Sequence, residues 1–177
     1  MKIIEHRKVY SGKILDLEIE RVQAGDGREK TREIVRHPGG VAVLAEIEGR
    51  ILFVRQLRYP LDSEVLELPA GKLDEQEDPM EAARRELEEE TGFRPSALRK
   101  IGEFLPSPGY SDEVLHIFVA VSVESSIQSL EWDEEIRVEY YSLSEAIRMI
   151  SRGEIRDAKT VIGLLWLANE RSGQIVE

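Results

Sequence analysis

Three glutamates near the middle of the chain, Glu86, Glu89 and Glu90, are spaced so that a helix brings their carboxylates to one face. Like charges at these spacings cost a helix roughly a few tenths of a kcal/mol per pair, which suggests a functional reason for keeping them. Oxygen ligands without cysteine or a nearby histidine favour a hard cation, Mg²⁺ or Mn²⁺. The alternative is a solvated acidic helix face, because glutamate is a good helix former.

A helix is indeed predicted at this point of the chain. Asp78 suits the N-cap, Pro79 the first helical position, and Glu81 lies three residues after the cap. The helix should run to about residue 90, with Gly92 as its C-terminal stop. The carboxylates then occupy its last turns, where the helix dipole disfavours anions, and Arg85 can pair with only part of the set.

The residues around these carboxylates follow a longer pattern that resembles the complete signature of the Nudix hydrolase family. The matching residues are Gly71, Glu77, Arg85-Glu86-Leu87, Glu89-Glu90 and Gly92-Phe93. The resemblance implies an α/β/α sandwich with a mixed central sheet, and hydrolysis of a nucleoside diphosphate linked to another group. It also implies that Glu86, Glu89 and Glu90 bind a divalent metal with the Ala70 carbonyl, and that Arg85 and Glu89 take part in catalysis. Gly71 is expected to permit the tight loop that enters the helix.

Over nearly its whole length the chain resembles one branch of that family, the ADP-ribose pyrophosphatases. Pro108 lies sixteen positions after Gly92, close to a characteristic proline of the branch. By resemblance, Glu113 faces the terminal ribose and Arg58 reaches the diphosphate, where a guanidinium can bind two oxygens at once.

The resemblance also extends to the N-terminal part of the chain. Arg32 and Glu33 are expected to frame the adenine, from an N-terminal segment that reaches the partner's site in a homodimer. Tyr10 is the one aromatic side chain of the early segment that could cover the other face of the base.

A further carboxylate is expected from the acidic loop at residues 131–135. The resemblance makes Glu134 a catalytic residue and the candidate general base, with Glu89 or Glu86 as the runner-up. Asp133 and Glu135 are close enough in sequence to be alternatives. On composition alone, this loop is equally well explained as a solvated acidic segment.

Composition limits the remaining possibilities. The 177 residues carry a net charge of −11, which argues against a nucleic-acid partner, and zero cysteines exclude disulfides and thiolate chemistry. No signal peptide or long apolar run is present, so we expect a soluble cytoplasmic protein without a membrane partner. The three histidines, His6, His37 and His116, show no metal-ligand spacing and receive no role.

The predicted elements form a mixed α/β fold. Residues 1–37 are expected to be a small N-terminal β segment acting as a dimerisation arm, with a turn at 25–27, and residues 38–177 the Nudix hydrolase domain. Within that domain, residues 41–47 and 51–57 should form a hairpin in the central sheet. Further strands are predicted at 65–68, 101–104, 114–123 and 137–141. Helices are predicted at 144–152 and at 157–169, the second burying Val161, Leu164, Leu165 and Ala168.

The predicted activity is the metal-dependent hydrolysis of ADP-ribose to AMP and ribose 5-phosphate by a homodimer with Mg²⁺. Another nucleotide sugar or a damaged nucleoside triphosphate is an alternative substrate. A non-catalytic nucleotide sensor is the alternative from a different functional class.

Overall fold

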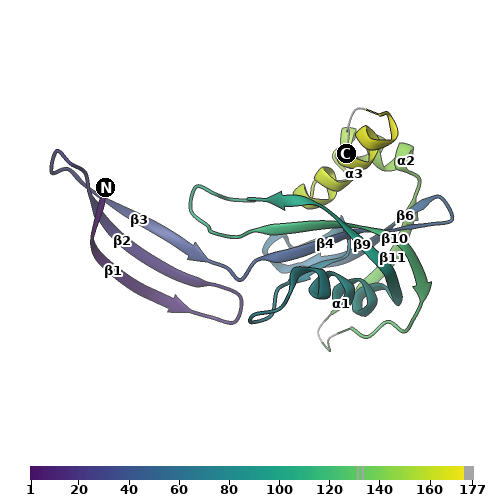
Figure 1. The fold of residues 1–177 in the computed structure, drawn as a ribbon, viewed down its shortest axis with the longest axis horizontal. Coiled ribbons are helices and arrows are strands. Elements are labelled where there is room, and N and C mark those ends of the chain that lie inside the picture. Colours follow the sequence, from purple (N-terminus) through teal and green to yellow (C-terminus); the bar gives the residue numbers. More distant parts are fainter. Residues whose placement is uncertain (131, 133, 174–177) are drawn as a thin grey trace.

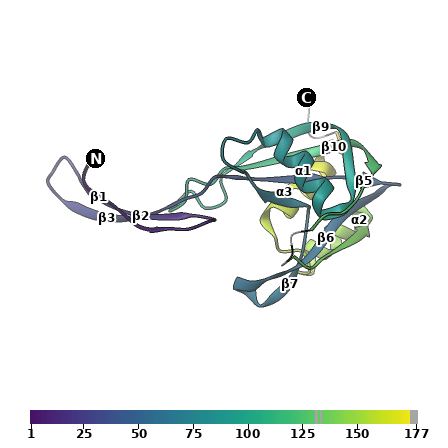
Figure 2. The ribbon, with the colours of Figure 1, turned by 90° about the horizontal axis from the view of Figure 1, so that it is seen from below.

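The computed structural model describes residues 1–130, 132 and 134–173, and shows an N-terminal arm that extends away from an α/β body (Figures 1 and 2). The arm is a three-stranded sheet whose central strand pairs antiparallel with both neighbours. Its strands are β1 (Lys2–Ser11), β2 (Asp16–Gln23) and β3 (Glu29–Arg36). The turn predicted at residues 25–27 lies between the second and the third.

Both outer strands of the arm are largely exposed. Within the arm, only Glu18 and Val22 are buried in the described part of the chain. The arm meets the body at the end of β3, where the Val35 N–H donates to the Tyr110 carbonyl at 2.7 Å and the Asp112 N–H donates to the Val35 carbonyl at 3.2 Å. Since Val22 is the only buried apolar residue of the described arm, the arm lacks the hydrophobic face that a small sheet needs to be stable alone.

The body contains a mixed sheet with the strand order β8-β4-β10-β9. Its strands are β4 (Gly40–Leu44), β8 (Ala70–Lys72), β9 (Phe93–Phe104) and β10 (Leu115–Ser125). β4 and β10 run parallel, whereas the other pairs are antiparallel.

A second sheet of the body is built around β6, which pairs with each of the other three strands. Its strands are β5 (Glu46–Ile47), β6 (Arg50–Arg58), β7 (Ser63–Glu67) and β11 (Ile136–Tyr141). The hairpin predicted between residues 41–47 and 51–57 exists only next to its turn, where Glu48 and Gly49 have positive φ. For residues 41–44 the prediction was wrong, because the fully buried strand β4 pairs with β10 and β8 instead.

Three α-helices of the described residues cover the sheets: α1 (Pro79–Thr91), α2 (Leu143–Ser151) and α3 (Ala158–Arg171). A short 3-10 helix, η1 (Tyr59–Leu61), follows β6. α1 begins and ends as predicted. The Asp78 carboxylate accepts from the Met80 N–H at 2.8 Å, and Gly92 ends the helix in the left-handed region at φ 72°.

The core lies on both sides of β4, because alternate residues of a strand face opposite ways. Val41 and Val43 pack with Leu87 of α1 in one cluster, and Leu44 packs with Leu164 of α3 in another. The expected α/β class, with helices on a mixed sheet, is confirmed. Leu165 was predicted to be buried but is 45% exposed, and Leu167 packs into the core instead. No helix in the described ranges is both long and apolar enough to cross a membrane.

Candidate active site

The three glutamates of α1 differ sharply in burial. Glu90 is 4% exposed and the Glu86 side chain 13%, whereas the Glu89 side chain is 45% exposed. Because the helix packs its Leu87 side against the sheet, the carboxylates sit along the border between core and solvent. The helix therefore presents two carboxylates of restricted hydration beside a third that stays hydrated.

Glu90 is the most confined of the three. Its Oε2 accepts the Ala70 N–H at 2.9 Å. Burial raises the pKa of the Glu90 carboxyl to about 8, and the nearby charges of Glu86 and Glu134 contribute to the same shift. Without a compensating cation this carboxyl is mostly protonated at neutral pH.

Glu86 lies directly against the backbone of Gly71. A Cβ at position 71 would overlap the Glu86 carboxyl group. The φ of Gly71 is not positive, so the glycine is required for space and not for the tight turn that we predicted. Burial raises the pKa of Glu86 as well, although the charge of Arg85 opposes the shift.

Arg85 organises the acidic set. Its Nε and Nη2 donate to the two oxygens of Glu77, each at 2.9 Å. Its Nη1 donates to Glu86 at 2.8 Å and to Glu89 at 3.1 Å. Glu77 also accepts the Asp74 N–H at 3.0 Å, so one guanidinium ties the loop before α1 to two carboxylates of the helix. These bonds raise the pKa of Arg85, which remains fully charged.

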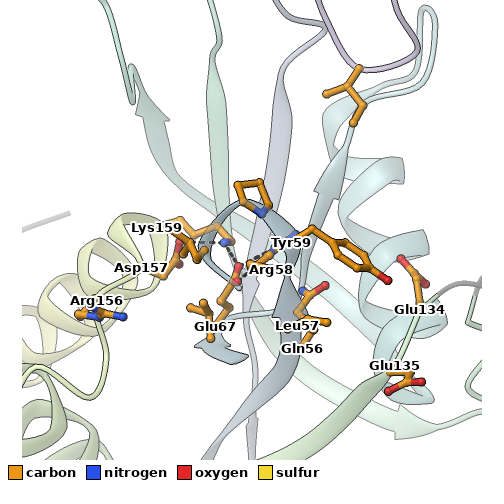
Figure 3. A pocket seen from close by; sticks show the side chains of 14 residues that line it. Gln56, Leu57, Arg58, Tyr59, Glu67, Glu134, Glu135, Arg156, Asp157 and Lys159 are labelled. Carbon is orange, nitrogen blue, oxygen red and sulfur yellow. Dashed lines mark hydrogen bonds and ion pairs between the residues drawn. The ribbon is translucent and has the colours of Figure 1, made fainter. Parts of the chain in front are cut away.

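A cavity of about 1110 Å³ opens beside this helix. Glu134 and Glu135 line one side of it, and Arg58 and Lys159 line another (Figure 3). The charge of Glu134 raises the pKa values of both Glu86 and Glu90, and the charge of Arg58 lowers that of Glu90. None of the three glutamates lines the cavity itself, so the acidic helix affects the cationic side of the cavity through its charge and not by contact.

Sequence reasoning missed part of this cavity. Arg58 was expected there, but its guanidinium is bound by the buried Glu67, and Lys159 binds the same carboxylate. An acidic residue at the end of an apolar strand was the only signal for Glu67, and a capped helix start was the only signal for Lys159. Their pairing spans 92 positions of the sequence.

Four other predicted substrate residues lie outside this cavity in the single chain. Arg32 and Glu33 are exposed on β3 of the arm. Pro108 and Glu113 belong to the segment between β9 and β10, against the end of the arm, where Glu113 Oε1 lies 3.9 Å from His37 Nδ1. Asp133, an alternative to Glu134, falls outside the described residues.

The carboxylates of α1 suit a divalent cation in their chemistry. Two of them have pKa values raised by burial, and among the described residues Glu90 receives one backbone N–H, that of Ala70, as a hydrogen-bond donor. At present, Arg85 Nη1 lies between oxygens of Glu86 and Glu89. A donor set of oxygens alone fits Mg²⁺ or Mn²⁺.

A separate cluster lies on the arm. Across the residues that the structure describes, His6, Glu18 and Glu20 alone bring three candidate ligand atoms within 4.8 Å of one another. Glu18 is already paired with His6 at 3.2 Å and with Arg36 at 2.8 Å. The cluster is thus explained as a surface ion-pair network.

Comparison with known proteins gives matches that cover the arm and the body. The model of the NUDIX domain family matches residues 35–162. An ADP-ribose pyrophosphatase of Bacillus subtilis (strain 168) is 43% identical over 169 residues, covering 94% of this chain and 91% of that protein. A methanol dehydrogenase activator of Bacillus methanolicus is 40% identical over 169 residues, with the same coverage of 94% and 91%. The crystal structure of an ADP compounds hydrolase has a TM-score of 0.85 at 19% identity, over 98% of this chain and 96% of that one, and so has the same fold.

Proposed function

The chain belongs to the NUDIX family, and on this premise we propose that it hydrolyses the diphosphate of ADP-ribose to AMP and ribose 5-phosphate. One observation carries the proposal. Arg58 and Glu134 line the same cavity, and the charges of both affect the pKa of Glu90 in the acidic helix. This arrangement supports a cation site and an anion-binding arginine that serve one ligand, as a nucleoside diphosphate sugar requires.

We propose that Glu86, Glu89 and Glu90, with the Ala70 carbonyl, hold the metal, Mg²⁺ or alternatively Mn²⁺. When bound, a divalent ion supplies positive charge to the phosphate oxygens and makes water easier to deprotonate. The raised pKa values of Glu86 and Glu90 support this assignment, because binding a cation is the natural way to keep both carboxyls ionised.

Other side chains of the site would perform the remaining steps. Arg58 binds oxygens of the diphosphate through the part of its guanidinium that Glu67 leaves open. Glu134 takes a proton from the water that attacks phosphorus, with Glu89 or Glu86 as the alternative base. Arg85 keeps Glu86 and Glu89 in place through its bonds to both.

We further propose that residues 1–37 form a dimerisation arm beside a catalytic domain at 38–177, in a homodimer. The arm's outer strands are exposed, and Ile3, Val9 and Tyr10 contribute exposed apolar surface that a second copy would bury. In such a dimer Arg32 and Glu33 would contact the adenine in the partner's cavity. Pro108 and Glu113 would contact the terminal ribose. The cytoplasmic location expected from the sequence stays a prediction.

A substrate panel tests the proposal against its alternatives. ADP-ribose, ADP-glucose, GDP-mannose and 8-oxo-dGTP would each be incubated with the protein in Mg²⁺ and in EDTA. The proposal predicts selective, metal-dependent release of AMP from ADP-ribose. A preference for GDP-mannose or the triphosphate would assign another substrate, and silence across the panel would favour a nucleotide sensor.

A further inference from the structure

Glu67 is a buried carboxylate that binds two cations at the floor of the cavity. The residue is 2% exposed, and Arg58 Nε and Nη2 donate to its two oxygens, each at 2.7 Å. Lys159 Nζ donates to the same carboxylate (Figure 3). Burial raises the pKa of Glu67, but the hydrogen bond from Arg58 and the charge of Lys159 outweigh it, so the net pKa is lowered. Glu67 therefore stays ionised inside the protein.

The two cations keep hydrogen-bond donors that Glu67 does not use. A guanidinium has five N–H donors, and Glu67 contacts Arg58 through Nε and Nη2, so the donors of Nη1 lie on the edge that Glu67 does not use. Of the three hydrogens of Lys159 Nζ, one faces Glu67 and one faces Asp157 at 3.0 Å, which leaves the third. Both side chains line the cavity, and the Arg58 side chain is 39% exposed.

The position of Lys159 is unusual for a purely structural cation. It lies in the first turn of α3, just after the N-cap Asp157, where the helix dipole disfavours positive charge. The bidentate pair with Arg58 already balances the charge of Glu67, so neutralising that carboxylate requires no second cation. Arg156 lines the same cavity, so three cations accompany the carboxylates Glu67 and Asp157 on the side away from Glu134 and Glu135 (Figure 3). The excess of positive charge is confined to this side, because the four carboxylates of the whole lining outnumber its three cations. This side of the cavity therefore suits the anionic part of a ligand.

We propose that Glu67 is a positioning residue that holds Arg58 and Lys159 as one two-cation subsite for the phosphate oxygens of a nucleoside diphosphate. Lys159 is then a substrate-binding residue that no sequence pattern indicated. The inference rests on the proposed function, because it assumes that the ligand of this cavity carries a diphosphate. It specifies which side chains outside the metal helix recognise that group.

The chain offers a matched control in the pair Arg55 and Glu139. Arg55, on the same strand β6 as Arg58, donates to Glu139 through Nε at 2.5 Å and Nη2 at 3.0 Å. Neither residue lines the cavity. Glu139→Gln therefore removes the same kind of ion pair without touching the proposed subsite.

The test is calorimetric titration of the full chain with ADP and with adenosine, in EDTA, so that binding depends on protein groups alone. Glu67→Gln and Lys159→Met should each weaken ADP binding about tenfold and leave adenosine binding unchanged. Lys159→Arg, which keeps the charge, should lose less. Glu139→Gln should bind both ligands like the wild type. If Glu67→Gln does not fold, the two Lys159 variants decide the question.

Three results would overturn the subsite: a change of less than about twofold in ADP affinity for folded Lys159→Met, an equal loss for adenosine, or a wild-type protein that binds ADP no better than adenosine. Release of AMP from ADP-ribose in Mg²⁺, measured in parallel, separates this inference from the proposed function. If the variants bind ADP more weakly but the wild type does not hydrolyse ADP-ribose, the subsite stands and the proposed activity is rejected. If the wild type hydrolyses ADP-ribose but the variants bind ADP as it does, the activity stands and the subsite is rejected.

Discussion

The carboxyl group of Glu86 occupies the space that a side chain at Gly71 would fill. The strand that carries Gly71, β8, and the helix that carries Glu86, α1, therefore approach each other more closely than any other residue at position 71 allows. This contact explains why a glycine lies fifteen positions before Glu86. The glycine leaves space for the Glu86 carboxylate, and the backbone at Gly71 needs no special conformation.

Gly71→Ala should therefore damage the site more than the fold. The added methyl group would displace the Glu86 carboxyl, and a displacement on the ångström scale can cost about a hundredfold in rate. Turnover of ADP-ribose and thermal unfolding would be measured together. Gly25→Ala is the control, because a Cβ there meets nothing within 4 Å. Equal activity of the two variants would mean that the position of Glu86 against Gly71 is not needed for catalysis.

Glu90 predicts a stability that depends on pH in the absence of metal. Its carboxyl has a pKa of about 8 in the folded protein against an ordinary 4.5, so the folded state holds a proton that the unfolded state has released. The stabilisation that Glu90 contributes is complete at pH values below its pKa in the unfolded state. It is lost as the pH rises through its pKa in the folded state. In EDTA, the melting temperature of the wild type should fall between about pH 5 and pH 8 more steeply than that of Glu90→Gln.

Added Mg²⁺ should reverse much of that loss at high pH in the wild type, because a bound cation stabilises the ionised carboxylate. Glu90→Gln should gain less. If the melting temperatures of the two proteins change with pH in parallel in EDTA, Glu90 does not hold the proton. If they also respond equally to Mg²⁺, Glu90 does not face the metal.

The bond between Arg85 and Glu77 predicts a coupling between the loop before α1 and the acidic helix. Glu77→Gln removes one of the two charge-assisted bonds and weakens the other, so we expect a loss of about 1–2 kcal/mol in unfolding free energy. The concentration of Mg²⁺ needed for half-maximal activity should also rise. Denaturant titration and a metal titration would measure the two effects.

Glu88→Gln is the matched control. Glu88 lies on the same helix as Arg85 and accepts two hydrogen bonds from Arg94, but this ion pair is at the surface. The variant should lose less stability and leave the metal requirement unchanged. A Glu77 variant that behaves like the Glu88 variant would contradict the coupling.

Arg32 tests the proposed arm. It is exposed on β3 and is not among the residues that line the cavity of its own chain, so the proposed dimer assigns its substrate contact to the partner's cavity. Arg32→Ala should raise KM for ADP-ribose about tenfold without a change in melting temperature.

Mixed dimers sharpen this prediction. A dimer of one Arg32→Ala chain and one Glu86→Gln chain would contain one intact site and one site with both defects. Random co-assembly should then restore about a quarter of the wild-type activity, measured well below KM. An Arg32→Ala protein that loses only stability, or a mixture no more active than its parts, would reject the shared site.

Prediction from sequence succeeded where local rules decide the structure. Asp78 and Gly92 mark the ends of α1 through capping chemistry, which depends on neighbours in the chain. It failed where distant partners decide. β4 does not form the expected hairpin, because a strand buried on both faces needs neighbours on both edges. Leu165 faces solvent, because α3 packs through Gly163, Leu164 and Leu167.

The candidate site divides in the same way. The carboxylates of α1 are visible in the sequence as helical spacing that conflicts with charge repulsion. The ion pairs of Glu67 with Arg58 and Lys159 are not visible in the sequence. The residues next to each cation in the chain give no indication of a buried carboxylate on another element. Buried charge networks of this kind follow from the fold alone.

The central claim is that the carboxylates of α1 support hydrolysis of a nucleotide sugar diphosphate in this chain. Its most direct test is the amount of AMP and ribose 5-phosphate formed from ADP-ribose in Mg²⁺ by the wild type and by Glu86→Gln. We predict equal amounts of the two products from the wild type, and a loss of about a hundredfold or more in the folded variant. Undiminished hydrolysis by Glu86→Gln, or no AMP from the wild type, would contradict the account.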